Sequence, residues 1–427
     1  MSSSSLDLTQ YAYAKNLDQD DPLARFRDEF HIPLTLTGSS QHYFCGHSLG
    51  LQPKRTAALM NEELQQWKEK GVEGHFTGTR PWLSYHEQLT SGLAELCGAL
   101  PMEVVAMNSL SVNLQLLLTS FYRPTHQRRK ILIEASAFAS DRYAVCSQLH
   151  LHGYNAQQDL IEISPRPGEH CIRMDDLLSV LERDGHSIAT VLLPGVQYLT
   201  GQLFDIQTIT RAAQQQGCLV GFDLAHAIGN VPLQLHDCNV DFAVWCSYKY
   251  LNSGPGAIGG AFIHERHAHD FTRPRLSGWW GHDKSSRFKM PHDFLPLPGA
   301  EGWQLSNPSI FACAPLVGSL DIFKQAGLPA LRLKSIQLTH YLYKLLTEQC
   351  PQVQILTPSQ QEDRGCQLSL RLPLTAQHAR MIHDQLHAQG IVCDWREPDI
   401  IRVAPVPLYN TYLDVWHFAQ SLQGLLN

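Results

Sequence analysis

The segment GFDLAHAIGN holds residue types suited to chemistry, because a short apolar run ends in Asp223 and His226 follows three residues later. A carboxylate at the end of a buried strand needs a cationic partner. A protonated pyridine nitrogen is one such partner, and a carboxylate that keeps it protonated lets the ring absorb electrons from a breaking bond. Aspartate is also favoured where a strand turns into a helix, so this segment alone leaves helix capping as an equal alternative.

A lysine stands 26 residues after Asp223, in the run DFAVWCSYKYLNSGPGAIGG. Lys249 lies between two tyrosines, after an apolar stretch and before a glycine-rich turn. Apolar and aromatic surroundings favour loss of the ammonium proton, which makes the amine nucleophilic. Taken alone, Lys249 is more typical of a surface lysine whose stem covers apolar neighbours.

The glycines at residues 254–259 have the GxGxxG spacing of a dinucleotide-binding loop. Such a loop must follow a strand and open a helix, whereas here the last glycine leads into the strand-like run GAFIHE. We therefore expect a tight turn beside Lys249 and no dinucleotide site.

The two segments together, strand-Asp-x-x-His followed by strand-Ser-x-Lys, resemble the fold-type I enzymes that use pyridoxal 5'-phosphate. By this resemblance Lys249 carries the cofactor as a Schiff base. Asp223 would pair with the pyridinium nitrogen, and His226 would lie close to the cofactor. The combination is much more specific than either segment alone.

The middle of the chain alternates short apolar runs with amphipathic stretches, which is typical of βα units stacked into a mostly parallel sheet. The expected strands are KILIEA, TVLLPG, CLVGFD, DFAVWCS and GAFIHE, with helices such as 141–151 and 206–216 between them. Sheets of this kind bind ligands at the carboxyl ends of their strands. The fold class is thus α/β, and the resemblance implies a seven-stranded sheet in a fold-type I, transferase-like large domain.

The pattern changes after Pro308 to long helices with two strand-like runs, QLSLRL and IIRVAP. We expect a large cofactor-binding domain over residues 66–310 and a smaller α+β domain over 311–427. The loop-rich segment 1–65 is expected to join the small domain.

Composition narrows the class of protein. The 427 residues include 44% hydrophobic and 17% charged ones, which fits a globular chain with a substantial core. A net charge of -7 gives no basic surface for nucleic acid. No run approaches the roughly 18 apolar residues of a membrane helix, and the N-terminus does not resemble a secretory signal. Eleven scattered cysteines without a CxxC pair suggest buried thiols in a reducing cytoplasm.

The run HERHAH brings His264, His267 and His269 together, and imidazole is a common metal ligand. No nearby cysteine or glutamate has the spacing of a zinc motif. We interpret this run as a polar strand end and expect no metal.

Several further blocks resemble the kynureninase family: FDLAHAIGN, WCSYKYLN, GAFIHERHAH, LSGWWGHD, RFKM and RVAPVPLYN. The resemblance extends from about His42 to the C-terminus. It implies hydrolytic cleavage of the Cβ–Cγ bond of L-kynurenine, and of 3-hydroxy-L-kynurenine, to an anthranilate and L-alanine. It also implies a homodimer, and a place in tryptophan breakdown or in the supply of NAD precursors.

The resemblance assigns roles to individual residues. Tyr248 would contact the cofactor phosphate and is a candidate proton donor. Phe138 would stack on the pyridine ring. The remaining cofactor positions by resemblance are Leu110 and Ser111 in the phosphate loop, Asp141, and Trp279 and Asn307 reaching across a dimer interface.

Substrate positions also follow from the resemblance. Arg402 would grip the α-carboxylate, a task suited to a bidentate guanidinium. His75 and Asn307 would face the aryl group. Ser111 stands where the family often has threonine and keeps the hydroxyl. Ala139 stands where proline is frequent and loosens the loop without removing a reactive group.

Two alternatives remain at this level. A cysteine desulfurase or selenocysteine lyase shares the Asp, His and Lys layout but needs a mobile nucleophilic cysteine, which no segment here offers clearly. A catalytically silent binding protein of the same fold is opposed by the intact reactive positions.

Overall fold

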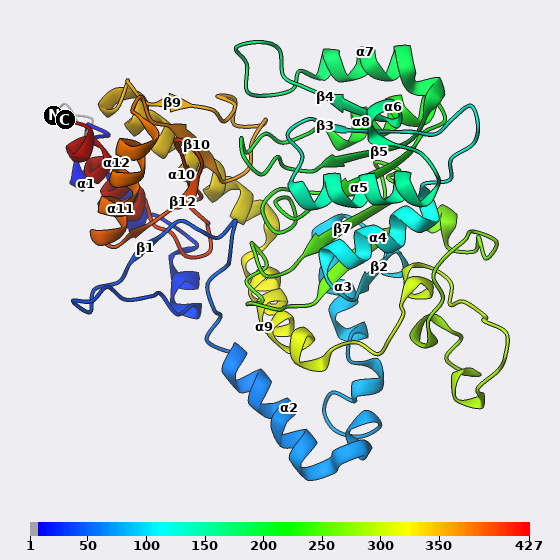
Figure 1. Cartoon of the computed structure of the whole chain (residues 1–427). Helices are drawn as coiled ribbons and strands as arrows, with labels where there is room; N and C mark the ends of the chain where they lie inside the picture. The colour runs from blue at the N-terminus through cyan, green and yellow to red at the C-terminus, as the bar shows by residue number, and fades with distance from the viewer. Residues whose placement is uncertain (1–6) are drawn as a thin grey trace.

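The computed structural model describes residues 7–427, and within them the largest sheet has seven strands (Figure 1). All run in one direction except β8, which is antiparallel to both of its neighbours. This confirms the mostly parallel sheet and the five strands expected from the sequence. Its order is β2 (Val104–Ala106), β8 (Gly259–Ile263), β7 (Phe242–Cys246), β6 (Leu219–Asp223), β5 (Ile188–Pro194), β3 (Lys130–Glu134) and β4 (Leu160–Ile163).

Helices cover both faces of this sheet, which is why its strands are apolar throughout. Along β7, Phe242 and Val244 pack under helices α4 and α5, whereas Ala243 and Trp245 face the opposite core. Successive side chains of a strand point to opposite faces, so one apolar run contributes side chains to the cores on both faces of the sheet. The flanking helices are α4 (Leu110–Phe121), α5 (Ala139–Leu151), α6 (Ala156–Asp159), α7 (Met174–Asp184) and α8 (Ile206–Gln215).

A second, four-stranded antiparallel sheet lies in the C-terminal part of the chain, in the order β12 (Asp394–Arg396), β13 (Ile400–Val403), β10 (Leu368–Arg371) and β9 (Gln354–Ile355). The N-terminal segment joins this part: β1 (His42–Tyr43) pairs with β11 (Ile391–Val392). Figure 1 shows helix α1 beside α12, with the C-terminus at this end of the molecule. The helices here are α1 (Tyr11–Gln19), α10 (Leu328–Gln349), α11 (Ala376–Ala388) and α12 (Tyr412–Leu426).

A further group of three helices packs together next to the large sheet. Helix α9 (Ile310–Ala326) packs against α2 (Thr56–Lys70) and α3 (Glu87–Cys97) and contributes to the core of the large sheet. The division of the chain at residues 65 and 310 stays a prediction. Short 3-10 helices occupy Ala24–Glu29, Gly71–His75, Trp82–Ser84, Pro101–Glu103, Gly185–Ser187, Glu265–His267, Trp279–Gly281, Arg287–Lys289 and Ala300–Trp303.

The carboxyl ends of β3, β5, β6 and β7 meet along one edge of the large sheet. Parallel strands bring their ends together in this way, and the helices that follow start at the same edge. None of the helices within residues 7–427 has the length and apolar content needed to cross a bilayer.

Candidate active site

Asp223 is the last residue of β6 and lies almost fully buried. The backbone N–H of Ala225 donates to its Oδ1 at 2.7 Å. Residues 225–230 form consecutive turns rather than an α-helix, so Asp223 does not cap a helix. Of the two interpretations left open by the sequence, a carboxylate awaiting a cationic partner fits the structure better.

Lys249 lies in the turn after β7, and its Nζ is 3.1 Å from His226 Nε2. The same Nζ is 5.8 Å from the centre of the Phe138 ring and 5.9 Å from that of Tyr248. The lysine amine therefore lies among the imidazole and the two aromatic rings that the sequence assigned to one site.

A second buried carboxyl group, Asp141, lines the same pocket as Asp223, and its Oδ1 has no hydrogen-bond partner within residues 7–427. Burial and the neighbouring Asp223 raise the pKa of Asp141 well above its usual range. Burial also raises the pKa of Asp223, but the Ala225 N–H and the charge of Lys249 oppose this effect. We therefore expect Asp141 to be the protonated member of this pair and Asp223 to be the carboxylate.

Two helix N-termini also border this pocket. Helix α4 begins at Leu110 and α5 begins at Ala139, and the hydroxyls of Ser111 and Ser140 are 2.8 Å apart. Free backbone amides and the helix dipole favour an anion at such a position. The pocket is lined by Leu110, Ser111, Glu134, Phe138, Ser140, Asp141, Pro194, Val196, Tyr198, Asp223, Ala225, His226, Tyr248 and Lys249.

These groups fit pyridoxal phosphate by their chemistry. A carboxylate suits the ring nitrogen, a lysine amine suits the aldehyde, and hydroxyls with helix N-termini suit the phosphate. The ring of Phe138 is 44% exposed, which leaves a face free for stacking. Burial raises the pKa of Tyr248, so its phenol keeps the proton and is a donor.

Arg402 lies on β13 behind the pocket wall, with no exposed surface. Its Nε donates to Asp394 Oδ1 at 2.7 Å, and its Nη1 donates to the carbonyl of Tyr198 at 2.6 Å. Although burial opposes ionisation, the hydrogen bond and charge of Arg402 lower the pKa of Asp394 to about 2. Since Tyr198 lines the pocket, the guanidinium lies directly next to it.

Comparison with known proteins places this site in a family. The chain is 53% identical to the kynureninase of Koribacter versatilis (strain Ellin345) over 428 residues, which cover 100% of both proteins. It is 54% identical to the kynureninase of Myxococcus xanthus (strain DK1622), covering 97% of this chain and 96% of that one. The chain belongs to the kynureninase family. The model of the kynureninase C-terminal domain matches residues 331–422, which include Arg402.

Solved structures of low sequence identity share the fold of this kynureninase family member. The complex of the cystine C-S lyase C-DES with cysteine persulfide aligns with a TM-score of 0.74 at 18% identity, covering 90% of this chain and 97% of that one. A cysteine desulfurase from Thermococcus onnurineus NA1 aligns with a TM-score of 0.71 at 18% identity, covering 96% and 98%. These likenesses confirm the fold-type I architecture.

Besides Arg402, three residues assigned through the kynureninase resemblance do not line the Lys249 pocket within this chain. His75 lies in the 3-10 helix Gly71–His75, with its ring 5.4 Å from that of Trp82. Trp279 is 40% exposed, and Asn307 is exposed in the segment before α9. For these three residues to contact the cofactor or the substrate, a second subunit or a different arrangement of this chain is needed.

Several pocket residues were not singled out in the sequence. Glu134 ends the strand KILIEA just as Asp223 ends its own strand, so the same signal was available for it. Burial raises the pKa of Glu134 to about 7. Pro194 is the last residue of β5, and Tyr198 comes from the segment after that strand, whose position no local pattern indicates.

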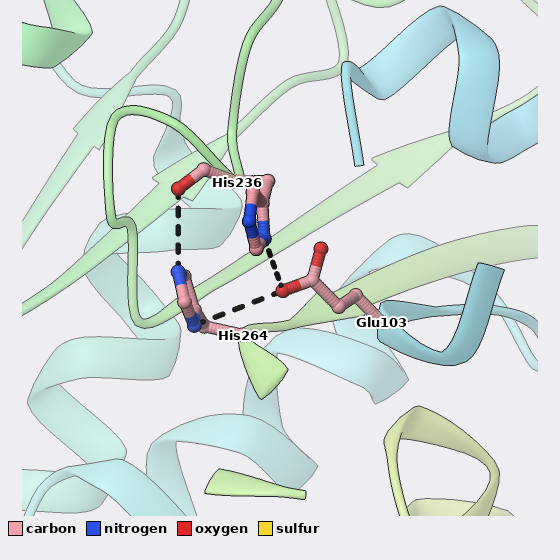
Figure 2. A group of neighbouring side chains, drawn as sticks. All are labelled: Glu103, His236 and His264. Atoms are coloured by element: carbon pink, nitrogen blue, oxygen red, sulfur yellow. Dashed lines mark hydrogen bonds and ion pairs between the residues drawn. The ribbon is translucent and has the colours of Figure 1, made fainter. Parts of the chain in front are cut away.

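The histidines of HERHAH lie away from this pocket. Figure 2 shows His264 and His236 around the carboxylate of Glu103. Glu103 Oε1 is 3.0 Å from His236 Nδ1 and accepts the Glu265 N–H, while His264 Nδ1 accepts the Arg266 N–H. The two imidazoles stack at 14°, so their in-plane lone pairs do not converge on one ion. We interpret the group as a hydrogen-bonded corner between β2 and β8.

Proposed function

We propose that this chain hydrolyses the Cβ–Cγ bond of L-kynurenine, and of 3-hydroxy-L-kynurenine, to the corresponding anthranilate and L-alanine. The observation that carries the proposal is the identity of more than half to kynureninases over the whole chain. The pocket at the carboxyl edge of the sheet holds the functional groups that this reaction needs. The place in tryptophan breakdown or NAD precursor supply follows from the same activity.

When bound, pyridoxal phosphate supplies an aldehyde that condenses with amines and a ring that accepts electrons. Asp223 holds the proton on the ring nitrogen and is kept in place by Ala225 N–H and Asp141. The amine of Lys249 takes the proton from the substrate Cα, and His226 holds that amine at 3.1 Å. The phenol of Tyr248 donates a proton to the substrate Cβ as its bond to Cγ breaks, and water supplies the hydroxyl that stays on Cγ in the anthranilate.

The remaining cofactor and substrate positions are also proposals. Leu110, Ser111, Phe138 and Asp141 hold the cofactor, which their location in one pocket supports. Arg402 binds the substrate α-carboxylate, while His75 and Asn307 face the aryl ring. Support for Arg402 comes from its buried charge next to the pocket wall.

The cysteine desulfurase alternative is disfavoured by the eleven cysteines, all of which are buried or partly buried. Cys246 lies beside the site, but it is 3% exposed and burial raises its pKa to about 11. A mobile persulfide carrier needs an accessible thiolate. The free thiols also support our proposal that the protein works in a reducing cytoplasm.

We expect the purified holoenzyme to form anthranilate from L-kynurenine and no sulfide from L-cysteine. Anthranilate fluorescence and a sulfide assay on the same preparation measure the two activities. A parallel assay with 3-hydroxy-L-kynurenine measures which of the two substrates, differing by one hydroxyl, the enzyme prefers. Sulfide release without anthranilate would favour the desulfurase.

We also propose a homodimer with a shared active site. The surface around Trp279 exposes large apolar side chains, which marks an interaction surface. Phe288 is 52% exposed, Met290 66% and Leu276 54%. By the family resemblance, Trp279 and Asn307 reach the cofactor phosphate of the other subunit, so their distance from the pocket of their own chain is expected.

Subunit exchange tests this shared site. Lys249→Ala and Trp279→Ala homodimers are both expected to have little activity. After equimolar exchange, about a quarter of the wild-type activity should return, because half of the dimers are mixed and each has one intact site. Anthranilate formation before and after exchange measures it. Activity that stays at the level of the separate variants would place Trp279 in the site of its own subunit, or outside any site.

A further inference from the structure

His47 lies in the loop formed by residues 45–50, next to the strand that carries Arg402. Cys45 pairs with Ala404 in a parallel bridge, two residues beyond Arg402. Ser48, the residue after His47, donates through its hydroxyl to Asp394 Oδ2 at 2.9 Å. The loop therefore lies against the small sheet at its buried arginine.

The other end of this loop is fixed to the Lys249 turn. The backbone N–H of Gly50 donates to the carbonyl of Tyr248 at 2.8 Å. A Cβ at Gly50 would come within 2.3 Å of the Lys249 carbonyl oxygen, so the approach of the two backbones requires glycine. The loop thus joins the lysine turn to the arginine strand, and His47 lies between them.

The imidazole of His47 is fully buried, and neither of its ring nitrogens has a hydrogen-bond partner within residues 7–427. Its ring centre is 6.2 Å from that of His226, which contacts the Lys249 amine. Buried polar atoms in folded proteins are nearly always paired, because an unpaired one keeps its desolvation cost. An imidazole in this position therefore indicates a polar group that it meets when the site is occupied.

The charges around His47 favour an anion as that group. Burial, together with the charge of Arg402, holds the pKa of His47 well below its usual range, so the ring is neutral and has one N–H donor. Arg402, Lys249 and Arg396 are the cations that act on it, and Asp394 is the one carboxylate. That carboxylate already accepts hydrogen bonds from both arginines and from Ser48.

The N–H groups of the Arg402 guanidinium differ in the hydrogen bonds that they make. Its Nε and Nη1 have short hydrogen bonds, whereas Nη2 has only a 3.5 Å contact with Ser48 Oγ. The two least satisfied donors in this corner are thus Arg402 Nη2 and the His47 ring, on which the charge of Arg402 acts. A carboxylate has lone pairs for both of them.

We propose that His47 donates a hydrogen bond to the α-carboxylate of the substrate and forms, with Arg402, a two-residue carboxylate site. The proposal rests on the proposed function for the identity of the substrate. His47 binds the substrate and takes no part in bond cleavage, so its removal acts on affinity.

The test compares His47→Phe, which removes the donor, with His47→Asn, which keeps one, in the reconstituted holoenzyme. For L-kynurenine, His47→Phe should raise KM roughly tenfold or more and change kcat by less than about threefold, as expected for a lost bond to a charged group. His47→Asn should recover most of the affinity. His86→Phe, at an equally buried histidine paired with Glu301, controls for the replacement of a buried histidine by phenylalanine.

Binding of two unreactive ligands separates the carboxylate role from general packing. 4-(2-Aminophenyl)-4-oxobutanoate keeps the carboxylate and lacks the α-amine, and its primary amide has the same shape without the charge. In calorimetric titrations His47→Phe should weaken the acid about tenfold and leave the amide unchanged. Equal weakening of both ligands, or an unchanged acid, would overturn the proposal. Wild-type protein that binds the acid but forms no anthranilate would overturn the proposed function alone.

Discussion

Lys249→Ala is expected to abolish kynurenine cleavage, with kcat lowered by at least about 10⁴-fold, because the variant loses both the covalent attachment of the cofactor and the base for the Cα proton. The Nζ atom lies 3.1 Å from His226 and close to two aromatic rings, and no other lysine lines this pocket within residues 7–427. Anthranilate formation and the visible absorption of the bound cofactor measure the two losses separately.

A matched control is Lys15→Ala, at an exposed lysine on α1, which should keep both absorption and activity. Borohydride reduction of the wild-type holoenzyme followed by peptide mapping should place the cofactor on the peptide that contains Lys249. A Lys249→Ala protein that retained both colour and turnover would refute the assignment of this lysine.

Asp223→Asn is the substitution with the second largest expected effect. Asparagine keeps the shape and can still accept the Ala225 N–H, but it has no charge with which to hold a proton on the ring nitrogen. We expect kcat to fall about a thousandfold or more, which corresponds to about 4 kcal/mol in the barrier. Steady-state turnover of L-kynurenine measures this loss.

Two comparisons test whether the lost charge of Asp223 is the cause of the lower kcat. Asp141→Asn keeps a hydrogen-bond donor toward Asp223, so its effect should be far smaller than that of Asp223→Asn. Asp223→Ala reconstituted with a cofactor methylated on the ring nitrogen should regain part of its activity, because that ring stays positive without a carboxylate. If Asp223→Asn turned over at nearly the wild-type rate, a role in protonating the ring would be excluded.

Much of the fold was predictable from short-range pattern. The expected strands were found in the large sheet because apolar runs of four to seven residues between turn signals have few other stable positions. Their order was not predictable locally. The reversal of β8 depends on how the chain returns between β2 and β7 after the Lys249 turn, and nothing in GAFIHE specifies it.

The residues of the site also fall into those that a local pattern indicates and those that it does not. Asp223, His226 and Lys249 could be read from the sequence because each follows an apolar strand, and parallel strands end at one edge. Arg402, Trp279 and Asn307 came only from family resemblance. Their positions depend on contacts between segments more than 100 residues apart in the chain, such as the bond from Arg402 to the Tyr198 carbonyl.

By itself, the sequence determined which strand ends carry the reactive carboxylate, imidazole and amine, because strand formation and side-chain type are local properties. Only the tertiary structure decided that Asp141 is buried in the same pocket as Asp223, that Arg402 is fully buried, and that the His47 ring is unpaired within residues 7–427. Burial, charge and hydrogen bonding depend on neighbours supplied by distant segments, so these properties arise only when both parts of the chain pack together.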